Sequence, residues 1–132
     1  MRYFKLIYVD NNHLYECGRY SGKTHTQAAF KAFSRLAGKI RDDNDYKTFV
    51  FCMRDCTSEG EYVGTKYIYH GIRKKLKEPK HIVIHKGLPD EKTIIYEHEN
   101  DVKLIKQTLC DNNQQLIDDM ERIKCECDQM IE

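Results

Sequence analysis

The chain has 132 residues, of which 40% are hydrophobic and 33% charged, so it can bury one core and we expect a single globular unit with appendages. No apolar run is long enough for a membrane span, and the start of the chain lacks the features of a signal peptide. Six cysteines without a regular framework predict reduced thiols inside a cell, which excludes a disulfide-stapled secreted domain.

The net charge of +1 conceals two different parts of the chain. Residues 1–90 hold 17 Lys and Arg against 10 Asp and Glu, whereas residues 91–132 hold 5 against 11. The first part is therefore +7 and the second −6. A basic globular part suits a polyanion, and an acidic C-terminal part suits either shielding of that charge or a protein partner.

A hairpin followed by a helix is predicted at the N-terminus. Residues 3–9 and 13–20 are rich in β-forming residues and flank a turn-forming Asp-Asn-Asn. Thr24 and Gln27 then have the spacing of a capping box, so a helix should start near Thr24 and run to about Gly38. Its apolar stripe follows intervals of three and four: Ala29, Ala32, Phe33, Leu36, Ala37 and Ile40.

Strands are predicted for the middle of the chain. Residues 46–54 alternate as a strand with one buried face, and a further strand or long arm runs from residue 62 to about 76. Bends are expected at its glycines, and Pro79 should end it. A last hairpin is expected from residues 81–86 and 93–96. The predicted fold is α+β: about six antiparallel strands in curved sheets, a pseudo-barrel, around one helix, plus a C-terminal helix.

Residues 1–98 are expected to form the domain and residues 99–132 an amphipathic helix. Its stripe, which exceeds what one small domain can cover, predicts a homodimer interface. The alternative is a kink at residues 111–115 that folds the helix back onto its own domain. The residues of the stripe are Leu109, Leu116, Met120, Ile123, Cys127 and Met130.

The tripeptide Gly22-Lys23-Thr24 has the context of a phosphate-binding loop. That loop requires G-x-x-x-x-G-K-[ST], and Cys17 stands where its first glycine should be. No later alternation of strands and helices predicts a parallel sheet, so NTP binding is not expected.

The same stretch resembles another family more closely. It carries the run G-x-Y-S-G-K-x-x-x-Q-A-A-x-K-A-x-x-R, which resembles a motif of the methanogen chromosomal proteins. These small archaeal nucleoid proteins bind and bend DNA as monomers and have relatives in large double-stranded DNA viruses. The run is present as Gly18, Tyr20, Ser21, Gly22, Lys23, Gln27, Ala28, Ala29, Lys31, Ala32 and Arg35. Weaker similarity continues to about residue 106, most closely to the viral branch. The resemblance implies the same core and a non-enzymatic architectural role, in which the protein recognises duplex DNA through its backbone and shape and compacts or bridges viral DNA.

The densest basic run, residues 73–80, is the first candidate for DNA contact. Alternation along a strand points Arg73, Lys75 and Lys77 one way, in a row that can follow phosphates. The alternative is an edge strand protected by lysines. Five more cations occupy positions of the resembled family: Lys23, Lys31, Arg35, Arg54 and Lys66. The run itself adds Arg73, Lys74, Lys75, Lys77 and Lys80.

Other classes of site find less support. Cys52 and Cys56, with His81 and His85, have the spacing of zinc ligands, but an extended segment holds the two sulfurs ~13 Å apart. We therefore expect no metal, no cofactor and no enzymatic activity. The second hypothesis is a protein-interaction module of the same fold that has lost DNA binding. The expected location is the host nucleus, a viral factory or the virion.

Overall fold

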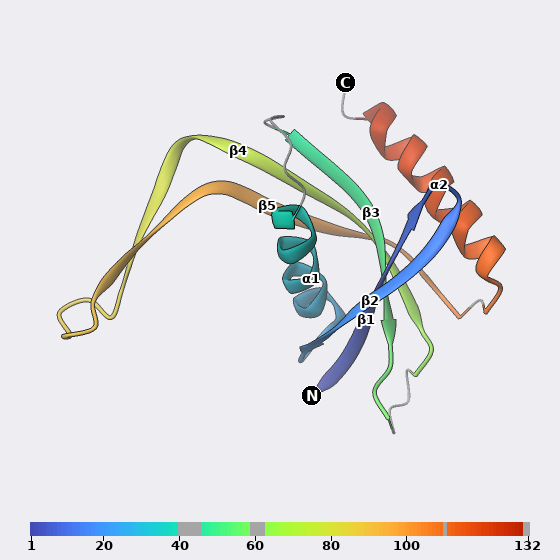
Figure 1. Ribbon diagram of the computed structural model, residues 1–132, viewed down its shortest axis with the longest axis horizontal. Coiled ribbons are helices and arrows are strands. Elements are labelled where there is room, and N and C mark those ends of the chain that lie inside the picture. The colour runs from blue at the N-terminus through green and yellow to red at the C-terminus, as the bar shows by residue number, and fades with distance from the viewer. Residues whose placement is uncertain (40–45, 59–62, 110, 131–132) are drawn as a thin grey trace.

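The computed structural model describes residues 1–39, 46–58, 63–109 and 111–130. The elements, in chain order, are β1 (Arg2–Asp10), β2 (His13–Gly22), α1 (His25–Lys39), β3 (Tyr46–Asp55), β4 (Lys66–Ile84), β5 (Lys92–Thr108) and α2 (Asn113–Met130). The strands form one antiparallel sheet in the order β2-β1-β3-β4-β5, which leaves β2 and β5 as edges and the sheet open. The predicted α+β class, with its curved antiparallel sheet, central helix and C-terminal helix, is confirmed (Figure 1), but the open sheet does not close into a barrel.

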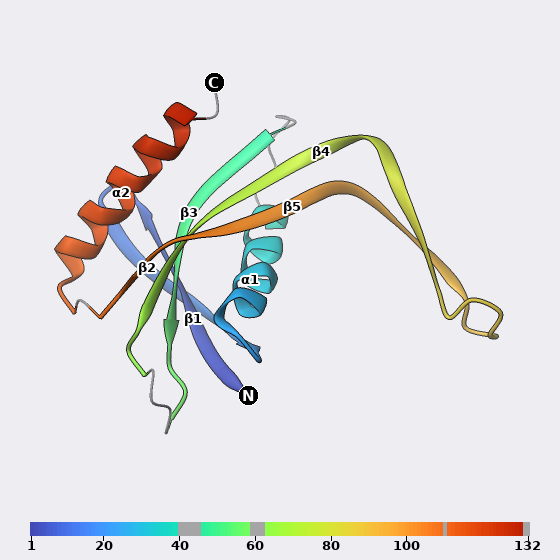
Figure 2. The same ribbon diagram turned by 180° about the vertical axis from the view of Figure 1, so that it is seen from behind.

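The two helices lie on opposite sides of the sheet (Figures 1 and 2). We call the side covered by α1 the inner face and the side covered by α2 the outer face. Alternation along each strand divides the apolar residues between two cores, since neighbours such as Phe51 and Cys52 point to opposite sides. The inner core contains Phe4, Leu6, Phe33, Phe51, Met53, Tyr67 and Tyr69, and the outer core Ile7, Cys52, Ile68, Leu116, Met120 and Ile123.

Helix α1 starts as predicted and lies close to the sheet. The Gln27 backbone N–H donates to the Thr24 hydroxyl at 3.2 Å, and the Gln27 side chain accepts from the Lys23 N–H at 2.7 Å. Small residues let α1 approach the sheet, and the closest contact is at Gly71 of β4. A Cβ built there would lie 2.5 Å from the ring of Phe33, which is fully buried. Gly71 thus fixes the position of α1 beneath β4.

Strands β4 and β5 continue beyond the sheet as one long hairpin, which we call the arm (Figure 1). The register jumps from Lys75↔His98 to Lys80↔Tyr96, so four residues of β4 oppose one residue of β5, and the arm bends in this part of its length. Pro79 does not end the strand as predicted. It lies within this bulge, where a missing N–H costs no ladder hydrogen bond. The predicted arm and last hairpin are therefore parts of the same two strands.

The helix predicted from residue 99 onward is wrong over its first part. Residues up to Thr108 belong to β5, which pairs with β4, and α2 begins only at Asn113. Val102 packs into the inner core from this strand, so the apolar spacing that suggested a helix also fits alternation. Asn112 caps α2 by accepting the Gln115 N–H at 3.1 Å.

The apolar stripe of α2 packs against the chain's own sheet. Leu116, Met120, Ile123 and Cys127 are buried in the outer core, and Lys106 of β5 holds Asp119 at 3.1 Å. The Asp119 carboxyl loses solvation, which by itself raises its pKa, but hydrogen bonds from Lys106 and Gln115 outweigh this and lower the pKa. The fold-back alternative therefore describes this helix, and the stripe from Leu116 to Cys127 is already covered, whereas Leu109 lies before the helix and is exposed. The side chain of Met130 lies outside the described residues.

A polar cluster closes the inner core where β1, β3 and β4 meet. Arg2 lies 2.9 Å from the buried carboxylate of Asp55 and donates to the Tyr67 hydroxyl at 3.1 Å. His25 stacks on the Tyr67 ring, with centroids 3.9 Å apart. Burial and the nearby Arg2 charge lower the pKa of His25, so the neutral imidazole is favoured.

Candidate nucleic-acid interface

Three of the predicted DNA-contact residues lie on or beside α1. Lys23 precedes the helix, and Lys31 and Arg35 lie one turn apart along it, all with exposed side chains. The Lys31 amine donates to the Ser21 carbonyl oxygen at 2.7 Å, which places it on the flank of α1 nearest β2. The opposite flank faces β5, because Ser34 accepts a hydrogen bond from Asn100 at 3.1 Å.

The basic run of β4 divides between the two faces. Tyr67, Tyr69 and Gly71 face α1, so alternation puts Arg73 and Lys75 on the inner face as well. Lys74 points to the outer face, where it lines a shallow surface hollow with Glu99 and Asp101. Figure 1 shows that this stretch of the arm arches over the side of the sheet that carries α1.

The remaining two cations of the run lie where the arm bends. Lys77 lies within the bulge and Lys80 is the first paired residue after it, and both side chains are exposed. At the base of the arm, Arg73 pairs across strands with Asn100. The Arg73 Nε and the Asn100 Oδ1 are buried atoms without a hydrogen-bond partner among the described residues. Sequence reasoning missed Asn100 and Ser34 as parts of this surface because it read residue 100 as a helix start.

The last two predicted residues, Arg54 and Lys66, lie on the outer face, opposite to α1. Arg54 forms a hydrogen-bonded ion pair with Glu16. Lys66 is mostly buried, and its amine lies 3.6 Å from a carboxylate oxygen of Asp111. The five cations at positions of the resembled family therefore do not form one surface. Lys23, Lys31 and Arg35 lie on the same side as Arg73 and Lys75, whereas Arg54 and Lys66 lie on the other side.

The predicted cations of the inner face and those of the outer face also differ in their ion pairs. Among the described residues, none of the inner-face cations Lys23, Lys31, Arg35, Arg73 and Lys75 lies within ion-pair distance of a carboxylate. Of the three outer-face cations of the predicted set, Arg54 and Lys66 each pair with a carboxylate, and Lys74 lines a hollow with Glu99 and Asp101. The inner face consequently carries uncompensated positive charge on two elements, α1 and the arm, with the helix between the arm and β2.

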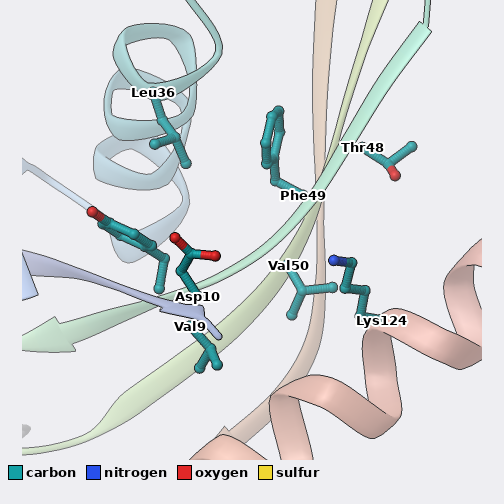
Figure 3. A pocket seen from close by; sticks show the side chains of 8 residues that line it. Val9, Asp10, Leu36, Thr48, Phe49, Val50 and Lys124 are labelled. Carbon is teal, nitrogen blue, oxygen red and sulfur yellow. The ribbon is translucent and has the colours of Figure 1, made fainter. Parts of the chain in front are cut away.

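A separate pocket of about 500 Å³ lies at one end of the sheet, between the two helices (Figure 3). Leu36 of α1 and Lys124 of α2 approach it from either side, and the ends of β1 and β3 form its floor. Its lining is Tyr8, Val9, Asp10, Leu36, Thr48, Phe49, Val50 and Lys124. No set of convergent polar groups indicates a ligand, so we assign none.

Cysteine and histidine do not gather into a metal site in the part of the chain that the structure describes, where no cluster of three or more His, Cys, Asp or Glu has suitable geometry. Cys52 lies in the outer core, and His81 and His85 lie on the arm. Burial raises the pKa of the Cys52 thiol to about 12, so it stays protonated and unreactive.

Two proteins of Acanthamoeba polyphaga mimivirus are similar to this chain. Uncharacterized protein R252 is 31% identical over 112 residues, which cover 82% of this chain and 39% of that protein. Probable ubiquitin-conjugating enzyme E2 R521 is 38% identical over 102 residues, which cover 76% of this chain and 7% of that protein. The chain thus spans less than half the length of either relative. No family model and no solved structure matches. None of the helices, as far as they are described, has the length and apolar character to cross a membrane.

Proposed function

We propose that the chain is a non-enzymatic architectural protein that binds duplex DNA with its inner face, through the phosphate backbone and with little dependence on base sequence. The observation that carries this proposal is the uncompensated charge of Lys23, Lys31, Arg35, Arg73 and Lys75 on two elements of one face. Cations without acidic partners leave a favourable site for phosphates, which release condensed counterions when they are neutralised.

The shape of the arm supports the same function. A two-stranded ribbon alone is marginally stable in water, yet this one extends well beyond the sheet (Figure 2). Lys75, Lys77 and Lys80 are exposed along it, close to the place where it bends over the inner side. A duplex that lies across α1 therefore meets cations of the helix and of the arm at once. The resemblance to methanogen chromosomal proteins supports the same partner.

The similarity to two mimivirus proteins supports a role in a large DNA virus, with the host nucleus, the viral factory or the virion as the place of action. It also favours a second candidate function. Because the matched stretch forms only 7% of the probable ubiquitin-conjugating enzyme, a segment similar to this chain also occurs as a small part of a much longer protein. A protein-interaction module that has lost DNA binding would fit that arrangement.

A salt titration of duplex binding tests the proposal and separates the two candidates. We expect the affinity of the full chain for a mixed-sequence duplex, followed by fluorescence anisotropy, to fall with salt at a logarithmic slope of about −4 to −5 if five cations contact phosphates. Lys31→Ala/Arg35→Ala should make the slope shallower by about 2. Arg122→Ala/Lys124→Ala removes the same charge from the exposed side of α2 and is the matched control. No binding at low salt would favour the interaction module.

A further inference from the structure

A row of cations crosses the outer face of the sheet beside α2. The register pairs Arg19 of β2 with Lys5 of β1, and Lys5 in turn with Arg54 of β3. Arg54 then pairs with Lys66 of β4, so four neighbouring strands each contribute one cation at the same level. Like charges directly opposite each other destabilise an antiparallel pair. The row therefore costs stability unless negative charge lies over it.

A β-bulge creates this row. Gly18 is skipped by the register, which passes from Lys5↔Arg19 to Leu6↔Cys17, and its φ of 68° is one that glycine adopts readily. If the pairing continued from Leu6↔Cys17 without this bulge, Gly18 would stand opposite Lys5 and Arg19 opposite Phe4, so Arg19 would point to the inner face. With it, Arg19 turns to the outer face, where its guanidinium lies 4.2 Å from the centre of the Tyr3 ring.

Three cations of the row surround an open hollow of about 640 Å³, lined by Lys5, Glu16, Cys17, Gly18, Arg19 and Arg54. Glu16 is the one carboxylate among these lining residues, all of which lie in the described part of the chain. It bonds to Arg54, and its carboxylate oxygen is 3.5 Å from the Lys5 amine. The hollow thus has three cations and one carboxylate, and that carboxylate pairs with Lys5 and Arg54. The fourth cation, Lys66, is mostly buried and lies near Asp111.

We infer that this outer hollow is a second binding site for the phosphodiester backbone of a duplex, so that one chain holds two duplex segments on opposite faces of its sheet. The choice of duplex DNA as the ligand depends on the proposed function, whereas the site itself is inferred from the strand register and the hollow. At a strand spacing of ~4.8 Å the three cations span about 10 Å. Over that length a duplex presents several phosphates, because it carries one charge per ~1.7 Å of its axis.

Glu16 gives the proposal a gain-of-function test. Its carboxylate competes with a phosphate for Lys5 and Arg54, so Glu16→Gln should strengthen binding at the outer hollow. The variant Lys5→Ala/Arg19→Ala/Arg54→Ala, which we call the outer triple variant, should weaken it. Both changes leave the inner-face cations untouched, and because Lys5, Arg19 and Arg54 are exposed or half-buried like charges, their removal is not expected to unfold the sheet.

The measurement is a bridging assay with the full chain. A biotinylated duplex on beads retains a fluorescent duplex only when the protein connects the two. We expect the wild type to retain the fluorescent duplex on the beads, Glu16→Gln to retain more of it, and the outer triple variant to retain none. The outer triple variant should still bind a single duplex, measured by fluorescence anisotropy.

The outcomes separate this proposal from the proposed function. A wild type that binds single duplexes without bridging them overturns the outer site and leaves the inner-face function standing. Unchanged bridging by the outer triple variant also overturns the outer site, because a dimer joined elsewhere would explain it. A wild type that binds no duplex overturns both.

Discussion

Replacing Gly71 by alanine tests how α1 is held beneath β4. The added Cβ would lie 2.5 Å from two atoms of the Phe33 ring, and the ring has little room to retreat because it stacks on Phe51 with centroids 5.8 Å apart. Overpacking of this kind costs about 1–3 kcal/mol. With an unfolding entropy of about 2.1 cal/mol/K per residue, the melting temperature should fall by about 4–11 °C.

Thermal unfolding followed by circular dichroism measures this loss, and Phe33→Leu provides the control. The smaller side chain removes the clash, so Gly71→Ala/Phe33→Leu should be more stable than the sum of the two single changes predicts, by about 1 kcal/mol or more. An unchanged melting temperature for Gly71→Ala, or strictly additive effects, would refute the close packing of α1 on β4.

Three further predictions concern stability and assembly. Burial alone would raise the pKa of the Asp55 carboxyl, but hydrogen bonds from Thr57 and Arg2 outweigh this effect and hold the pKa below its ordinary value. The ionised carboxylate therefore stabilises the fold above about pH 4, and this stability is lost as the pH falls through the lowered pKa. Asp55→Asn should therefore flatten the acid limb of a stability profile measured by urea unfolding, and an unaltered limb would contradict the ion pair. Leu116→Ala should cost about 2–5 kcal/mol because Leu116 is buried in the outer core, whereas Leu109→Ala, at an exposed leucine, should cost little; equal effects would mean that α2 does not pack as described. Since the stripe of α2 is covered, light scattering should find the full chain monomeric at micromolar concentration, and a dimer would revive the interface predicted from the sequence.

Local signals predicted most of the core fold. The Asn-containing turn between β1 and β2, the capping box at Thr24 and the alternation in β3 each depend on neighbouring residues, and each element formed as expected. The errors arose where distant pairing decides the outcome. Val102 fits a helix or a strand by spacing, and only pairing with Gly71 makes it a strand residue.

The candidate site was predictable in composition but not in geometry. Alternation correctly separates Arg73 and Lys75 from Lys74, because it needs only the period of a strand. No sequence rule places Arg54 and Lys66 on the face opposite to α1, since that depends on which core each strand residue enters. The position of Arg19 depends on a single bulge at Gly18, which alternation alone cannot reveal.

The most direct test of DNA binding by the inner face compares Lys75→Glu with Lys74→Glu. The two lysines are adjacent and exposed, and the substitutions change the charge equally, but the side chains point to opposite faces of β4. In a salt-titrated anisotropy measurement with a mixed-sequence duplex, Lys75→Glu should weaken binding and lower the salt slope by about 1, while Lys74→Glu should stay close to the wild type. Equal losses from both substitutions, or no loss from Lys75→Glu, would contradict binding by the inner face.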